Sequence, residues 1–243
     1  MLLDISPETR LVINLLGGVG GLIALLLSII LFSKYKKKRS KVIQNLAIAF
    51  LLFVISGLSA LPIAFFPGDY AINKLSYLIA KIFYTLAVWY FINFIEAIFN
   101  PAEGREKQYR IFKYGVLIAS LILVVIYHPW EIVLHLESGR TVTNILPPTL
   151  IVIHSFLMAV PFLWLLILAI NIAKKTDDLK EKWAIKFIAY SGLFMACFFI
   201  FNGINEWIQV PNPMTIPAWI SAILALNLFY IGVARPKLIF KNI

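Results

Sequence analysis

The sequence contains few charged residues and a single cysteine. Charged residues make up 14% of the 243 residues and hydrophobic residues 61%, whereas a typical soluble domain is about 25% charged. Cys197 is the only cysteine, so the chain can form no internal disulfide and no cysteine metal cluster. We therefore expect neither a disulfide-stapled domain nor a metal centre.

Acidic residues are also scarce, with 12 Asp and Glu against 22 Lys and Arg, for a net charge of +10. A basic surface can indicate nucleic-acid binding. Here, however, the basic residues concentrate in alternate short connections between apolar runs, which is a signal of membrane topology. We expect no nucleic-acid partner.

Catalytic motifs are absent as well. The sequence contains no HExxH motif, no glycine-rich phosphate loop and no serine-nucleophile motif. His128, His135 and His154 are all expected at or near one face of the membrane, so they cannot ligate stacked haems. The last apolar run, AWISAILALNLFYIGVA, has no lysine that could carry retinal. We expect a protein that is not an enzyme and has no cofactor.

What the sequence does contain is seven apolar runs, each long enough to cross a hydrocarbon core about 30 Å thick. The predicted spans are about 9–33, 42–66, 72–99, 109–127, 148–173, 184–208 and 217–234. They predict an all-α integral membrane protein, a seven-transmembrane-helix bundle embedded in lipid, with residues 1–243 forming one domain.

Orientation follows from the Lys and Arg residues of the connections. The first, third and fifth connections and the C-terminal tail are rich in them, as in KYKKKRSK at 34–41, whereas the opposite connections hold only Arg10, Lys74 and Arg140. The positive-inside rule then places the N-terminus outside and the C-terminus in the cytoplasm. The longest outer connection, 128–147, is compatible with a short β-hairpin or with an irregular loop.

Three ionisable residues fall inside predicted spans, where a charge is costly: Lys81, Glu96 and Glu206. Lys81 and Glu206 are expected at similar depth near the outer face. Two interpretations stay open: they pair across the bundle, or each reaches the outer interface independently.

Glu206 shares a helix face with Asn202 because the two are four residues apart. Together with other residues expected at similar depth, this shared face predicts an outward-facing polar and aromatic pocket for an unknown small-molecule ligand. The predicted lining is Lys81, Tyr84, His154, Asn202, Asn205, Glu206 and Trp219. For His154 and Trp219 the alternative is interfacial anchoring, since aromatic belts lie at this depth.

Near the inner face, Glu96 follows Asn93 by about one turn, and a basic loop residue or Arg235 is expected to reach it. The pair is either a plain charge contact or an inner switch that breaks when helices shift.

Other polar and small residues in the spans are expected to join helices. Asn45, Asn171 and Asn227 are predicted to form interhelical hydrogen bonds. The GxxxG spacing of Gly17 and Gly21 predicts a close crossing, either within the bundle or in a homo-oligomer.

Several stretches resemble one family: NLAIAFLLFVISGLSAL at 45–61, YHPWEIVLHLES at 127–138, KEKWAIKFIAYSGLFMA at 180–196 and IGVARPKLIF at 231–240. They look like the seven-transmembrane N-terminal sensor module of prokaryotic, often archaeal, histidine kinases. The resemblance implies an archaeal or bacterial cell-membrane protein. No kinase domain follows the last run, so it implies either a separate cytoplasmic signalling partner, such as a kinase in trans, or a fragment of a longer kinase.

The expected function is that of a receptor-like sensor, which binds a ligand in the outer pocket and transmits a helix rearrangement to a cytoplasmic partner. A small-solute transporter or channel-like protein and a membrane scaffold subunit are the alternatives. A pocket closed at its base favours a receptor, a continuous polar path favours transport, and an apolar bundle without a cavity favours a scaffold.

Overall fold

The computed structural model describes residues 7–59, 61–62, 70–99, 106–126, 132–133, 143–144, 148–208 and 214–234. This part of the chain consists almost entirely of seven long helices. They are α1 (Pro7–Lys38), α2 (Lys41–Ser59), α4 (Tyr70–Phe99), α5 (Glu106–Ile126), α6 (Pro148–Lys175), α7 (Leu179–Ile208) and α8 (Thr215–Ala234).

Six of the described helices are long and apolar enough to cross a membrane, namely α1, α2, α4, α6, α7 and α8. This confirms a helical multi-pass membrane protein. The remaining helix, α5, carries Glu106, Lys107, Arg110 and Lys113 in its first turns. A seventh span at α5 stays a prediction.

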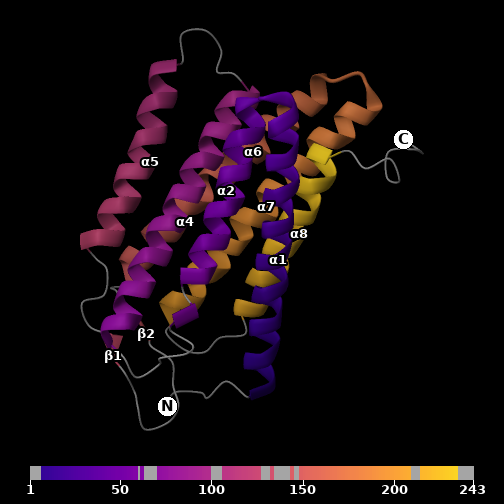
Figure 1. Cartoon of the computed structure of the whole chain (residues 1–243). Helices are drawn as coiled ribbons and strands as arrows, with labels where there is room; N and C mark the ends of the chain where they lie inside the picture. The colour runs from indigo at the N-terminus through magenta and orange to yellow at the C-terminus, as the bar shows by residue number, and fades with distance from the viewer. Residues whose placement is uncertain are drawn as a thin grey trace.

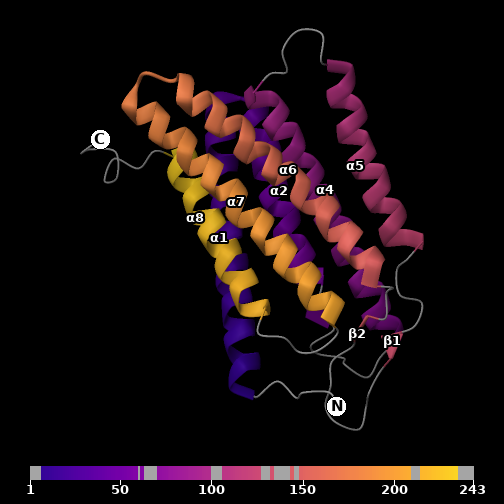
Figure 2. The same cartoon turned by 180° about the vertical axis from the view of Figure 1, so that it is seen from behind.

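The six apolar helices form a closed ring in which each packs against the next. α1 contacts α2, α2 contacts α4, α4 contacts α6, α6 contacts α7, α7 contacts α8, and α8 returns to α1. α5 lies outside this ring and packs mainly on α4 and α6. Figures 1 and 2 show α5 set at the edge of the bundle, with the start of α1 and the end of α8 toward opposite ends.

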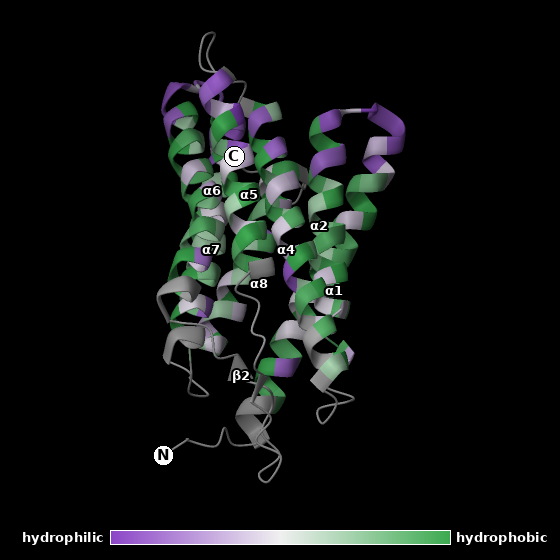
Figure 3. Ribbon diagram, turned by 90° about the vertical axis from the view of Figure 1, so that its left-hand side faces the viewer, coloured by the Kyte–Doolittle hydropathy of each residue, from purple (hydrophilic) through white to green (hydrophobic). Residues whose placement is uncertain are grey.

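Most of the described basic residues gather at one end of the bundle, which we call the basic end. It holds the last turn of α1, with Lys36, Lys37 and Lys38, and the last turn of α6, with Lys174 and Lys175. Figure 3 shows hydrophilic ribbon at this end and hydrophobic ribbon along the helices. The opposite end holds the starts of α4, α6 and α8.

The short connection between α6 and α7 is set by its own polar residues. The backbone N–H of Lys180 donates to Asp178 Oδ1 at 3.0 Å, which makes Asp178 the N-cap of α7. Thr176 Oγ1 donates to the carbonyl of Ile172 at the end of α6. With so few residues between them, the two helices lie antiparallel and pack along their length.

Small residues let these helices approach closely. An added Cβ on Gly192 of α7 would lie 2.7 Å from the carbonyl oxygen of Phe162 on α6, and one on Gly232 of α8 would lie 2.8 Å from that of Ala184 on α7. Large apolar side chains such as Phe156 and Ile167 are exposed on the outside. Close contacts inside and apolar residues outside are what lipid-embedded bundles need.

The long predicted outer connection contains two short strands, β1 (Ile132–Val133) and β2 (Thr143–Asn144). They pair antiparallel, with Ile132 opposite Asn144 and Val133 opposite Thr143. The residues that would join them in a hairpin lie outside the described ranges, so the hairpin itself stays a prediction.

One prediction about the polar residues of the spans is wrong. Asn227 was expected to bond between helices, but it is exposed and its Nδ2 donates to the carbonyl of Ile223 in its own helix. Asn171 is also exposed, whereas Asn45 is half-buried on α2. A polar side chain facing lipid can satisfy itself on the preceding turn, so its presence in a span does not identify an interface.

Candidate functional site

The predicted outer pocket draws on four helices in the structure. Lys81 and Tyr84 lie on α4, His154 on α6, Asn202 on α7 and Trp219 on α8. Lys81 and His154 come from helices that pack against each other, α4 and α6.

The glutamate of the predicted pocket cannot be placed in the same way. Asn205 and Glu206 belong to the last turn of α7, but their side chains lie outside the described part of the structure. Asn202, one turn earlier, is half-buried. The Lys81–Glu206 pair stays a prediction.

Tyr84 is part of an aromatic cluster rather than an isolated polar group. Its ring centroid lies 5.5 Å from that of Phe53 on α2, and 5.2 Å and 6.4 Å from those of Phe199 and Phe198 on α7. Such ring pairs contribute packing energy beyond the area they bury. Tyr84 thus ties α2, α4 and α7 together.

Trp219 packs toward α1. Its indole lies 3.4 Å from the Cβ positions that Gly17 and Gly20 would have, and its ring centroid lies 5.6 Å from that of Phe198. By contrast, Gly18 and Gly21 have nothing within 4 Å of such a Cβ. Gly17 and Gly20 therefore form a flat seat for an indole within the bundle. Gly21, the second glycine of the predicted GxxxG pair, meets nothing within 4 Å, so the close crossing at that pair stays a prediction.

At the basic end, Glu96 of α4 forms an ion pair with Lys113 of α5. Lys113 Nζ donates to Glu96 Oε2 at 2.7 Å, and the two side chains are 30% (Glu96) and 12% (Lys113) exposed. The predicted partner of Glu96 was a basic loop residue or Arg235. Lys113 instead lies two turns inside α5. Arg235 lies outside the described ranges, and Asn93 is half-buried on α4.

The centre of the bundle is filled by phenylalanine rings. Phe91 and Phe162 have centroids 4.5 Å apart, Phe162 and Phe199 5.3 Å, and Phe91 and Phe229 5.6 Å. These residues come from α4, α6, α7 and α8, so the rings join the walls across the bundle axis. The axis is closed by aromatic packing at this depth.

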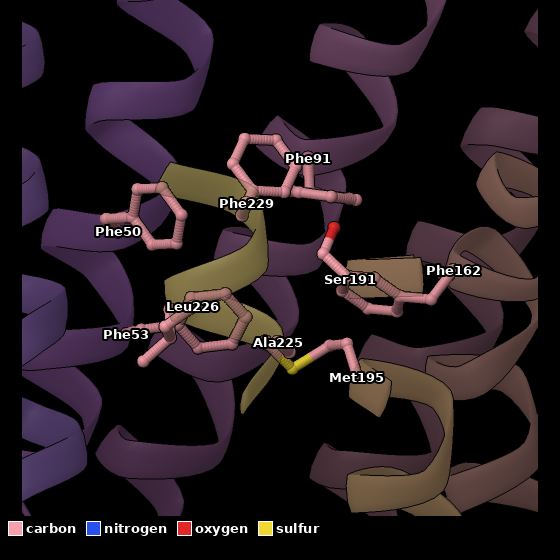
Figure 4. A pocket seen from close by; sticks show the side chains of 9 residues that line it. All are labelled: Phe50, Phe53, Phe91, Phe162, Ser191, Met195, Ala225, Leu226 and Phe229. Atoms are coloured by element: carbon pink, nitrogen blue, oxygen red, sulfur yellow. The ribbon is translucent and has the colours of Figure 1, made fainter. Parts of the chain in front are cut away.

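A small cavity lies among these rings (Figure 4). Its lining is Phe50, Phe53, Phe91, Phe162, Ser191, Met195, Ala225, Leu226 and Phe229. The cavity volume is about 10 Å³, close to the least that one water molecule needs. Its one hydroxyl, that of Ser191, donates to the carbonyl of Ile188. The cavity therefore offers a ligand no free polar group.

Sequence reasoning missed a second set of polar residues, on α4 and α5. Thr85 and Trp89 of α4 follow Lys81 at intervals of four residues, and Ser120 of α5 follows Lys113 by two turns. Thr85 is 1% and Ser120 0% exposed. The four-residue spacing from Lys81 was the available signal, because residues at this spacing lie on one face of a helix.

Among the described residues, no group of three or more His, Cys, Asp or Glu side chains is placed to hold a metal ion. Cys197 is a half-buried free thiol. Comparison with protein-family models, with curated proteins and with solved structures finds no match.

Proposed function

We propose that this protein is a receptor-like membrane sensor, which binds a small molecule at the end opposite the basic end and passes a helix rearrangement to a cytoplasmic partner. The observation that supports this best is the aromatic closure of the bundle axis by Phe91, Phe162, Phe199 and Phe229. A pocket above such a closure has a floor. It can hold a ligand without passing it across the membrane.

In this proposal α5 is the moving element. The six helices of the ring close on one another, whereas α5 lies outside the ring and packs on α4 and α6. The Glu96–Lys113 pair ties it to α4 near the basic end. A ligand that prefers one position of α4 relative to α5 changes the population of the two packings by its difference in affinity for them.

The finer assignments belong to the same proposal. They are seven spans including α5, an N-terminus outside and a C-terminus in the cytoplasm, a hairpin over the outer end, and an archaeal or bacterial cell membrane. The basic end, with its lysines, is then the cytoplasmic end, as the positive-inside rule requires. The partner in this picture is a cytoplasmic signalling protein, such as a kinase in trans.

The test uses the full chain in lipid nanodiscs, with Cys197→Ser and spin labels attached at Ile111→Cys on α5 and Leu179→Cys on α7. Both positions are exposed and lie at the basic end. The distance distribution between the labels is measured by pulsed electron paramagnetic resonance. Lys81→Met, which removes a charge at the far end of α4, is expected to shift this distribution.

The matched control is Lys175→Met, which removes an exposed lysine at the basic end itself and is expected to leave the distribution unchanged. If Lys81→Met also leaves it unchanged while the protein stays folded, the two ends are not coupled. The bundle would then behave as a rigid scaffold, and the proposal would be rejected.

A further inference from the structure

Four buried polar atoms on α4, α5 and α6 have no hydrogen-bond partner in the described part of the chain. They are Thr85 Oγ1, Trp89 Nε1, Ser120 Oγ and His154 Nε2. All four belong to the three helices that meet where α5 packs on the ring. We call this three-helix contact the α5 seam.

On α4 the polar groups form one line. Lys81, Thr85 and Trp89 are spaced by four residues, so each lies one turn further along the same face. Glu96 continues the line toward the basic end and contacts Lys113 of α5. The face of α4 that carries these residues is therefore the face turned toward α5.

The Glu96–Lys113 ion pair serves as the reference point for the depth of Trp89 and Ser120 along the bundle. α4 and α5 run in opposite directions, and Trp89 and Ser120 each lie seven residues from the ion pair, toward the opposite end. At 1.5 Å per residue both are about 10 Å from it, so they lie at the same depth. Ser120 is fully buried, and its helix packs mainly on α4 and α6, so its hydroxyl faces the seam.

Several other described hydroxyls of the bundle are satisfied by the chain. Ser28 donates to the carbonyl of Ala47 across the α1–α2 contact, and Ser56 to that of Ala80 across α2–α4. Ser33, Ser59 and Ser191 donate to carbonyls of their own helices. Thr85 and Ser120 do neither. An indole N–H such as that of Trp89 has no way to bond the preceding turn of its own helix.

Hydrocarbon cannot supply the missing partners, and polar groups left without one inside a membrane are unfavourable. Buried water molecules fill this role in proteins and typically make about three hydrogen bonds each to such groups. The seam offers donors from Trp89, Thr85 and Ser120, and a ring nitrogen from His154. This is the set of partners that ordered water needs.

We propose that the α5 seam binds a group of water molecules, held by Thr85, Trp89, Ser120 and His154, which hydrates the seam from Lys81 to the depth of Trp89 and Ser120. The hydrated stretch from Lys81 to Trp89 measures about 12 Å along α4. It runs beside the closed aromatic axis rather than through it. It therefore goes beyond the sensor function, since it assigns bound water to the contact between α5 and the ring.

The test is radiolytic labelling of the full chain in lipid nanodiscs. X-rays split water into hydroxyl radicals, which oxidise side chains in contact with bound water, and ¹⁸O-water identifies the source of the added oxygen. We expect ¹⁸O incorporation at Trp89 and His154. Met195, which lines the apolar central cavity, serves as the internal control. It is expected to stay unlabelled even though methionine reacts readily with radicals.

Two variants address the seam itself. Ser120→Ala and Thr85→Val remove hydroxyls that have no protein partner, and each is expected to remove most of the labelling at Trp89. Ser191→Ala removes an equally buried hydroxyl that is bonded within its helix, and is expected to leave Trp89 labelling unchanged. Unlabelled Met195 in every variant verifies that the core has stayed closed.

The proposal is overturned if wild-type Trp89 and His154 are as unlabelled as Met195, because the seam would then be dry or filled by lipid. It is also overturned if Ser120→Ala and Ser191→Ala have the same effect. Neither result bears on the coupling measured between the spin labels, so the sensor function and the hydrated seam can fail independently.

Discussion

Gly192→Ala is the sharpest test of how the ring is packed. The new methyl group would lie 2.7 Å from the carbonyl oxygen of Phe162 and 3.4 Å from the backbone nitrogen of Leu166, both on α6. Neither is the end of a flexible side chain. Ordinary contact begins near 3.4 Å, so the distance from the new Cβ to the Phe162 oxygen must grow from 2.7 Å to about 3.4 Å. α6 and α7 must therefore separate locally by about 0.7 Å.

The energy of this change has two parts. Overpacking of a close-packed contact typically costs about 1–3 kcal/mol, and the rigid backbone on both sides favours the upper half of that range. Alanine gains about 1 kcal/mol over glycine from helix propensity. We expect a net loss of about 1–2 kcal/mol in the free energy of unfolding, which is about a tenfold change in the folding equilibrium.

The assay is reversible unfolding in mixed micelles by titration with sodium dodecyl sulfate, followed by circular dichroism. The matched control is Gly115→Ala on α5, where an added Cβ has nothing within 4 Å. It is expected to be neutral or stabilising by up to about 1 kcal/mol. If Gly192→Ala were as stable as Gly115→Ala, the close α6–α7 crossing described above would be incorrect.

Three further predictions concern single contacts, each measured in the same unfolding assay. Glu96→Gln or Lys113→Met should each lower the free energy of unfolding by about 1–3 kcal/mol, which is less than for a fully buried pair because Glu96 is 30% exposed. The double variant should lose less than the sum of the two single losses, and strict additivity would refute the pairing. Trp219→Ala should lower the free energy of unfolding by about 3 kcal/mol or more, because it empties the space against Gly17 and Gly20. Trp183→Ala, at an exposed position, should lower it much less. Equal losses would contradict the packing of Trp219 on these glycines. Asn227→Leu should change stability by no more than about 0.5 kcal/mol, whereas Ser28→Ala should cost about 1 kcal/mol by removing the bond to Ala47; the reverse order would show that Asn227 joins helices after all.

The helical membrane architecture could be predicted because it depends on length and polarity alone. The span expected at 148–173 is α6, Pro148–Lys175, and the one at 9–33 lies within α1, Pro7–Lys38. α1, α6 and α7 extend past the predicted limits because their polar ends, such as KYKKK at 34–38, continue the same backbone hydrogen bonding into water, whereas α2, expected to reach residue 66, ends at Ser59.

The facing of side chains could not be predicted in the same way. In a soluble helix an apolar stripe marks the buried face, but in lipid the outer face is apolar too. Nothing in the pattern around Asn227 therefore distinguishes lipid from core, and nothing around Trp219 points to the glycines of α1. A basic loop residue was predicted to reach Glu96, but the place of Lys113 inside α5 was not, because a lysine near the end of an apolar run resembles a connection residue until Glu96 is placed beside it.

The central claim is that the two ends of the bundle are coupled, and coupling between two sites must be reciprocal. The most direct measurement therefore perturbs the basic end and observes the opposite one. Spin labels at Leu75→Cys on α4 and Ile153→Cys on α6, both exposed positions near the start of their helices, report the opposite end in the Cys197→Ser background. Glu96→Gln should shift their distance distribution, whereas Asp177→Asn, which neutralises an exposed carboxylate at the basic end, should not. An unchanged distribution in folded Glu96→Gln protein would contradict the account.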